Sequence, residues 1–140
     1  ADREAFEDRT KVLIDQYAVL SPEGADGQTV NGELTIGENI GDLGGLGIAH
    51  QAYRIATEGR EVPEIDGMTG DQRFFWAWAV AWRGKYRPET VKLRLATDPH
   101  SPNEFRCNQV VRNLDAFHEA FGTTAADDLW LAEQDRVTIW

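Results

Sequence analysis

Five glycines fall within eleven residues of this chain, at positions 37, 41, 44, 45 and 47. They follow the T-x-x-E pattern Thr35–Glu38, which is typical of a capping box and predicts a helix from Thr35 to about Glu58. Each glycine inside a helix costs about 1 kcal/mol relative to alanine, so propensity alone would favour a loop. A helix here requires another backbone or helix in close approach to the glycines. We predict that helix, and with it such a neighbour.

The rest of the chain predicts more helices, separated by loops that contain proline and glycine. Helices are expected over residues 2–20, 71–86, 88–96, 103–113 and 114–121, and loops over residues 21–27, 59–69 and 97–102. The Asn-Gly pair within Val30–Leu34 predicts a tight turn between short extended pieces. Aromatic and apolar side chains lie nearly all round the helix at 71–86, which indicates burial in a larger assembly. Gly122 is expected to end the last helix. The predicted fold class is mainly α.

Composition narrows the class of protein. The chain has 140 residues, 41% of them hydrophobic and 27% charged, which fits a single domain or fragment over residues 1–140. Its net charge of −10 disfavours binding to nucleic acid. No apolar run approaches the roughly 20 residues of a membrane span, and no signal-peptide pattern occurs. Cys107 is the single cysteine and cannot form an internal disulfide. Because the chain begins with Ala1 rather than Met, we expect a processed or trimmed piece.

Two carboxylates, Glu38 and Asp42, lie four residues apart and therefore on one face of the predicted helix. One interpretation is a metal ligand, Glu38, beside a group that orients another ligand. The alternative is a capping glutamate and a solvated aspartate near a helix start, which spacing alone favours. The histidines, His50, His100 and His118, have no metal-binding spacing, and H-E-x-x-H is absent. The chain alone therefore contains no complete metal site.

The other candidates lie in the loop at 97–102 or in the helix predicted to follow it. His100 and Arg106 could converge from a loop-to-helix junction to stabilise an oxyanion and hold a carbonyl, or both could be ordinary surface residues. Cys107 with His100 could form a thiol hydrolase, but a helical cysteine without a third group is more often a small buried hydrophobe. The glycine run lacks the patterns of phosphate-binding loops.

Four motifs occur in a fixed order along the chain: Val30–Gly32 with Gly37–Gly45 (N-G…G-E-N-I-x-D-x-G-G), Phe74–Phe75 with Trp82 and Tyr86–Arg87, Asp98–Pro102 with Phe105–Arg106 (D-x-H-S-P-x-x-F-R), and Trp140 as a terminal tryptophan. In this order and at these separations they resemble the neprilysin family of zinc metallopeptidases. The resemblance extends from about Phe6 to the end of the chain. It implies the C-terminal helical part of the catalytic domain of a gluzincin-type metallopeptidase.

The resemblance also implies a role for each candidate. In this family zinc is held by the two histidines of H-E-x-x-H and a later glutamate. Glu38 would be that glutamate, the third zinc ligand. The implied catalytic roles are those of Asp42, which would orient a zinc-bound histidine, and His100, which would stabilise the tetrahedral oxyanion. Arg106 would bind a backbone carbonyl of the peptide substrate.

Two departures from the family pattern shape the functional prediction. H-E-x-x-H is missing because in the family it lies N-terminal to where this chain begins. We therefore expect a segment of a zinc metalloendopeptidase that needs the N-terminal remainder of the same peptidase, binds one zinc ion only with it, and is inactive alone. Val137 replaces a cysteine of animal members, which suggests a bacterial type, cytoplasmic or secreted.

A non-catalytic interaction module derived from such a peptidase is the alternative function. The aromatic helix supports it, because an orphaned apolar face predicts self-association of the isolated chain.

Overall fold

The computed structural model describes residues 2–139, and every element of regular secondary structure found there is a helix. They are α1 (Asp2–Ala18), α2 (Gly32–Thr57), α3 (Gly70–Ala81), α4 (Pro88–Thr97), α5 (Asn103–Val111), α6 (Asp115–Phe121) and the 3₁₀ turn η1 (Glu133–Asp135). The mainly α fold class is thereby confirmed. Trp140 lies outside the described residues.

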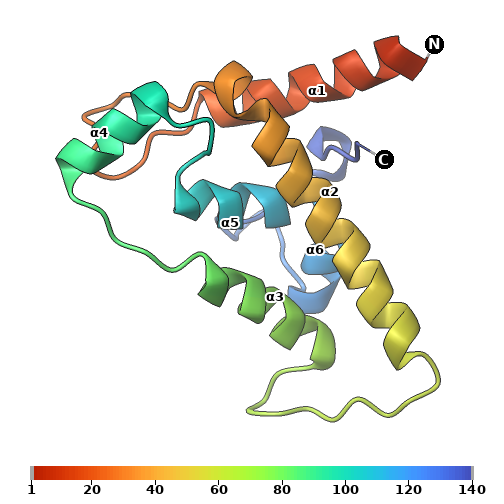
Figure 1. Cartoon of the computed structure of the whole chain (residues 1–140). Coiled ribbons are helices and arrows are strands. Elements are labelled where there is room, and N and C mark those ends of the chain that lie inside the picture. Colours follow the sequence, from red (N-terminus) through yellow and green to blue (C-terminus); the bar gives the residue numbers. More distant parts are fainter. Residues whose placement is uncertain (1, 140) are drawn as a thin grey trace.

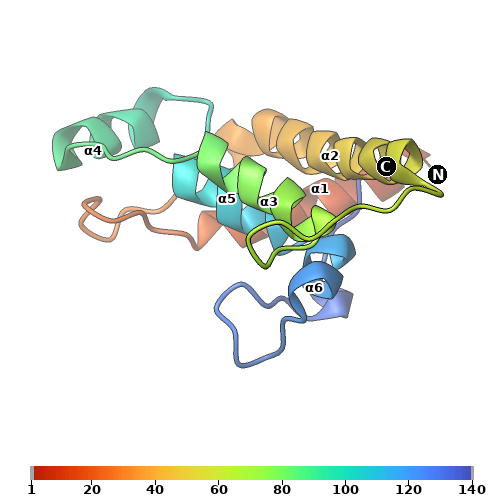
Figure 2. The same ribbon diagram turned by 90° about the horizontal axis from the view of Figure 1, so that it is seen from below.

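Helix α5 lies at the centre of the molecule. It contacts α1, α2 and α3, while α1 crosses the N-terminal half of α2 and α6 packs on α3 (Figure 1). The core between these helices is formed by Leu13, Tyr17, Leu43, Leu46, Phe75, Val110, Val111 and Phe117. Helix α4 stands apart at one edge in both views and buries none of its residues (Figure 2). Among the described residues, no helix is long and apolar enough to cross a membrane.

Helix α2 begins three residues earlier than the capping-box prediction placed it. Asn31 is its N-cap and accepts a hydrogen bond from the backbone N–H of Leu34 at 3.0 Å. The predicted turn at Val30–Leu34 and the predicted box at Thr35–Glu38 are therefore both wrong. Packing favours the earlier start, because a Cβ on Gly32 would lie 2.5 Å from the carbonyl oxygen of Ile14. The carboxylate of Glu38 is left free of any capping role in α2.

The glycine face of α2 is bare. A Cβ added at Gly37, Gly41 or Gly45 would meet nothing within 4 Å, whereas one at Gly47 would touch Leu114 at 3.6 Å. The predicted helix exists, but the close neighbour expected at these three glycines does not lie within residues 2–139. Their cost in helix propensity is therefore not offset by a contact at these positions inside this part of the chain.

Helix α3 is shorter than predicted, since it ends at Ala81 rather than Tyr86. The side chain of Asn103 donates to the carbonyl oxygen of Trp82 at 3.2 Å, which replaces a continuing helical bond there. Only Phe75 of α3 is buried, and Trp76 is 58% exposed, so residues 2–139 do not bury α3 on all sides. The other predicted bounds agree to within two residues, and Gly122 ends α6 with φ +59° as expected.

Candidate active site

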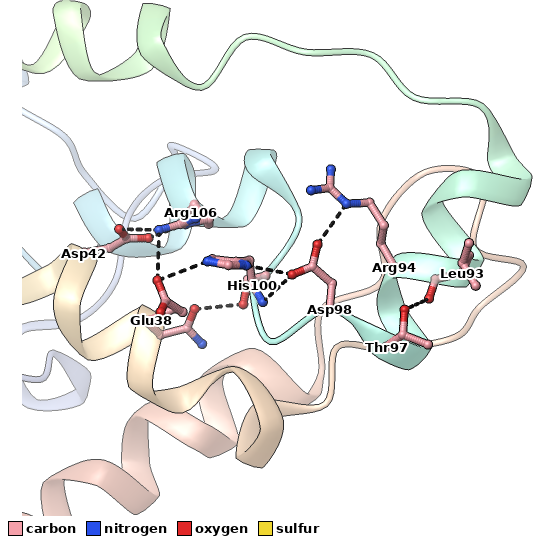
Figure 3. Close-up of polar contacts among 10 residues, drawn as sticks. Glu38, Asp42, Leu93, Arg94, Thr97, Asp98, His100 and Arg106 are labelled. Carbon is pink, nitrogen blue, oxygen red and sulfur yellow. Dashed lines mark hydrogen bonds and ion pairs between the residues drawn. The ribbon is translucent and has the colours of Figure 1, made fainter.

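The fold brings the four candidate residues of the sequence analysis to one place. Glu38 and Asp42 lie one turn apart on α2, Arg106 lies in the first turns of α5, and His100 lies in the loop that precedes α5 (Figure 3). Asp42 and Arg106 are 64 residues apart in sequence, so only the packing of α5 on α2 joins them.

Arg106 and Asp42 form a two-pronged ion pair. The guanidinium donates from Nε to Oδ2 at 2.6 Å and from Nη2 to Oδ1 at 2.8 Å, and it also lies 4.3 Å from the centre of the Trp82 ring. The side chains of Arg106 and Asp42 are only 15% and 10% exposed. The hydrogen bond to Asp42 raises the pKa of Arg106, so this arginine stays charged. The pair fixes α5 to α2 and holds the carboxylate in one orientation.

Glu38 is the least enclosed member of the cluster. Its carboxylate is 46% exposed and lies 3.3 Å from Nε2 of His100 and 3.7 Å from Nη2 of Arg106. These long contacts leave lone pairs of the carboxylate available to a further partner. A carboxylate oxygen is a suitable ligand for zinc, but no group of three histidines, cysteines or acids within residues 2–139 could hold a metal ion. The donor set of this chain thus fits one zinc ligand rather than a whole site.

Asp98 contacts both the backbone and the imidazole of His100. Oδ1 of Asp98 accepts the backbone N–H of His100 at 2.9 Å and lies 2.7 Å from its Nδ1. With Nδ1 occupied in this way, Nε2 is the ring nitrogen that faces Glu38. The N–H of His100 lowers the pKa of Asp98 most, which keeps this carboxylate ionised. Asp98 belongs to the D-x-H-S-P motif but was given no role from sequence, although an aspartate that accepts the backbone N–H two residues later is a signal for this local turn.

A buried polar pair fixes the His100 loop to α2. Ser101 donates to Oδ1 of Asn39 at 2.8 Å, and Asn39 donates in turn to Oγ1 of Thr35 at 3.0 Å. Asn39 is fully buried and Ser101 is 3% exposed. These residues are the chain neighbours of Glu38 and His100, so their bond sets the distance between the two. Both lie within the motifs of the sequence analysis but were given no role there, and the available signal was Asn39, a poor helix former inside a predicted helix.

Two further titratable groups take no part in the cluster. Tyr17 is fully buried, and burial, followed by the charge of Asp42, raises its pKa, so its phenol stays neutral. Burial also raises the pKa of the Cys107 thiol. A thiol of raised pKa is a poor nucleophile, which disfavours the thiol-hydrolase alternative.

The chain resembles known proteins over almost its whole length. The model of peptidase family M13 matches residues 1–137. Neprilysin-1 of Caenorhabditis elegans is 42% identical over 129 residues, which cover 89% of this chain and 17% of that protein. Human neprilysin is 41% identical over 120 residues, which cover 83% of this chain and 16% of that protein. The chain thus spans about a sixth of the length of these curated relatives.

Solved structures agree with the fold. The zinc metalloprotease Zmp1 of Mycobacterium tuberculosis, in complex with an inhibitor, superposes with a TM-score of 0.95 at 53% identity, covering 99% of this chain and 22% of that one. PepO of Lactobacillus rhamnosis superposes with a TM-score of 0.80 at 31% identity, covering 99% of this chain and 20% of that one. The helical architecture described above is therefore that of a segment of these larger proteins.

Proposed function

This chain belongs to peptidase family M13, and on that premise we propose that it is the C-terminal helical segment of a zinc metalloendopeptidase that hydrolyses peptide bonds. The observation that carries the proposal is the convergence of Glu38, Asp42, His100 and Arg106 on one spot. A metal ligand, a carboxylate that orients a ligand and two donors for a developing oxyanion are the groups that metal-assisted peptide hydrolysis requires.

Glu38 would be the third zinc ligand. Zinc, when bound, would polarise the scissile carbonyl and lower the pKa of a bound water. The half-exposed carboxylate on the open face of α2 suits this role, because two positively polarised groups, on His100 and Arg106, already orient it without enclosing it. Asp42 would orient a zinc-bound histidine from the rest of the protein. The two hydrogen bonds from Arg106 leave further lone pairs on both oxygens of Asp42 for that purpose.

His100 and Arg106 would act on the substrate. Because Nδ1–H of His100 is donated to Asp98, Nε2 carries a proton only when the ring is an imidazolium, and in that form Nε2, which faces Glu38, can donate to the oxygen of a tetrahedral intermediate. The fork of Arg106 uses Nε and Nη2, so the remaining nitrogen of the guanidinium can bind a backbone carbonyl of the peptide.

The bare face of α2 supports an N-terminal remainder of the same peptidase as partner. Gly37 and Gly41 flank Glu38 and meet nothing within 4 Å, so another helix could approach this backbone closely. Apolar side chains on α2 are also exposed, namely Leu34 (42%), Ile48 (63%) and Ile55 (66%). A helix carrying the two histidine ligands would cover this face and complete the zinc site.

Zinc content tests the proposal. In the complete enzyme, Glu38→Gln should lower bound zinc from about one ion to a small fraction and reduce peptide hydrolysis by about 1,000-fold, because one ligand of three is lost. Glu33→Gln, an exposed glutamate in the first turn of the same helix, is the matched control and should change neither. Unchanged zinc and activity in Glu38→Gln would disprove the ligand role.

The isolated 140-residue chain supplies a second test. We expect it to bind no stoichiometric zinc and to cleave no peptide, since one carboxylate cannot hold a catalytic zinc ion against water. Chelator-sensitive cleavage by the isolated chain would contradict this.

Exposed apolar side chains favour the second candidate, a non-catalytic interaction module. Trp76 is 58% and Leu93 64% exposed, and such side chains promote association. Sedimentation of the isolated chain should then show self-association, and a monomer at high concentration would count against the module.

A further inference from the structure

One ion pair outside the cluster is linked to it through a single carboxylate. In the last turn of α4, Arg94 donates from Nε to Oδ2 of Asp98 at 2.9 Å, while its guanidinium lies 4.9 Å from the centre of the Tyr86 ring. The hydrogen bond to Tyr86, and then that to Asp98, raise the pKa of Arg94. Arg94 is therefore a permanent cation that is held on one side by an aromatic ring and on the other by Asp98.

Asp98 divides its two oxygens between different partners. Oδ2 accepts from Arg94, whereas Oδ1 serves the backbone N–H and Nδ1 of His100 (Figure 3). Rotation of an aspartate carboxylate about its last torsion is soft, so a partner on one oxygen restricts the position of the other. Fixing Oδ2 thus fixes the atom on which the imidazole of His100 rests.

A pair of the same kind elsewhere in the chain shows what is special here. Arg3 and Glu7 have the same spacing of four residues and the same Nε donor, with a distance of 2.7 Å. The side chain of Glu7 is 58% exposed, however, whereas that of Asp98 is 18% exposed and holds a second residue. An exposed pair of this spacing contributes little to stability. The Arg94–Asp98 pair differs because its acid is already engaged with a group of the site.

Little empty space remains between the imidazole of His100 and α4. A cavity of about 30 Å³ remains between α4 and the loop, bordered by Tyr86, Arg94, His100 and Asn103 among others. That is room for about one water molecule, so the imidazole has little space to turn toward α4. Its orientation is decided by Asp98 at Nδ1 and by Glu38 at Nε2.

We propose that Arg94 is a positioning residue: acting through Asp98, it holds the imidazole of His100 with Nε2 directed at Glu38 and at the oxyanion of the substrate. The inference rests on the proposed function of His100. It makes α4 more than a peripheral helix, since its last turn supplies the support for a group that contacts the transition state.

The test uses the complete enzyme and separates positioning from folding. Arg94→Gln should lower kcat about 3- to 10-fold with KM changed by less than about twofold, because only an interaction of the transition state is weakened. Affinity for a phosphinic peptide, a tetrahedral mimic, should fall by a similar factor. Arg94→Lys, which keeps a positive charge near Asp98 but not the planar group over Tyr86, should give a kcat between those of the wild type and Arg94→Gln.

A double-mutant cycle identifies the route. Asp98→Asn should lower kcat more than Arg94→Gln does, and in the Asp98→Asn background Arg94→Gln should have no further effect. Arg3→Gln and Thr97→Ala are the controls: the first breaks the matched pair, and the second removes the bond from Thr97 to the carbonyl of Leu93 in the same turn of α4. Both should keep the kcat of the wild type.

Three outcomes would overturn the inference. The first is a kcat of Arg94→Gln equal to that of Arg3→Gln, and the second is a double variant in which the separate losses of kcat from Arg94→Gln and Asp98→Asn multiply. The third is an Arg94→Gln variant in which only KM changes. Failure of the proposed function is recognised separately, because Glu38→Gln and His100→Ala would then leave zinc and turnover unchanged. If those two variants are inactive while Arg94→Gln behaves as wild type, only the role of Arg94 is disproved.

Discussion

Two polar clusters join distant parts of this chain, and they differ in how completely they are satisfied. Asn113, 3% exposed, donates to Gln16 at 2.8 Å and to the carbonyl of Gln109 at 2.9 Å, and accepts from Gln16 at 3.0 Å and from the backbone of Val137 at 2.8 Å. Glu38, 46% exposed, has its neighbours at 3.3 and 3.7 Å.

The difference separates a cluster that is complete within the fold from one that has the capacity to bind a ligand. An amide whose donors and acceptors are all paired inside the protein stabilises the fold and has no capacity left for a ligand. A carboxylate with long contacts and half its surface exposed contributes little to stability and can still bind a metal ion. Variants of the first cluster should therefore change the free energy of unfolding, and variants of the second should change activity.

Asn113→Ala should have the largest effect on stability. It leaves the carbonyl of Gln109 and the N–H of Val137 without these partners in a buried region and removes two of the hydrogen bonds of Gln16, which should cost about 3 kcal/mol of the free energy of unfolding. Urea denaturation measures this loss. Asn108→Ala, at an exposed position on α5, the helix that ends two residues before Asn113, is the control. A loss below about 1 kcal/mol would show that the amide cluster is not a structural centre.

Arg106→Gln should combine both kinds of effect, because this residue is nearly buried yet belongs to the charged cluster. Removing it leaves Asp42, 10% exposed, without its fork, which should cost about 2 kcal/mol of stability and raise KM for peptides. Thermal unfolding and steady-state kinetics provide the two measurements. Arg83→Gln, at an exposed position, should change neither quantity. A variant of normal stability would mean that Asp42 finds another partner.

Ser101→Ala should have a smaller effect on stability and a selective one on turnover. The lost bond to Asn39 is buried and should cost about 1 kcal/mol. Because that bond holds the loop of His100 to α2, kcat should fall about 3- to 10-fold while KM changes little. Ser21→Ala, at an exposed serine, is the matched control. Equal kinetics in the two variants would rule out a positioning role for the Ser101–Asn39 pair.

Glu104→Gln should give the smallest effect, and one that depends on pH. Burial first, and the charge of Glu23 to a lesser degree, raise the pKa of Glu104 in the folded protein. The penalty on its charged form is absent below the pKa of the unfolded chain, grows as the pH rises through the raised pKa, and is complete above it. Glu104→Gln should therefore stabilise the protein by about a few tenths of a kcal/mol at pH 7 and not at pH 3. A gain of equal size at both values would refute the electrostatic cause.

How far sequence reasoning reached is clearest at α2. The motifs around Glu38 and around His100 indicated the family and the four residues that the fold brings together, but the capping-box interpretation gave the wrong start for the helix. Asn31 caps it instead, because Gly32 must lie against the carbonyl of Ile14 where α1 crosses α2. The contact of Gly32 with Ile14 leaves no local signal, whereas the asparagine at the N-cap is a local signal that the capping-box interpretation passed over.

The sequence by itself determined where α4, α5 and α6 begin or end. Pro88, Pro99 and Pro102 restrict their own φ and that of the preceding residue, and Gly122 adopts a positive φ at little cost, so these limits are fixed by local sterics. The tertiary structure alone decided the partners: Asp42 with Arg106, Ser101 with Asn39, and Asp98 between Arg94 and His100. The limits on φ follow from the type of each residue and of its neighbour, whereas side chains as much as 64 residues apart can pair only once the helices have packed.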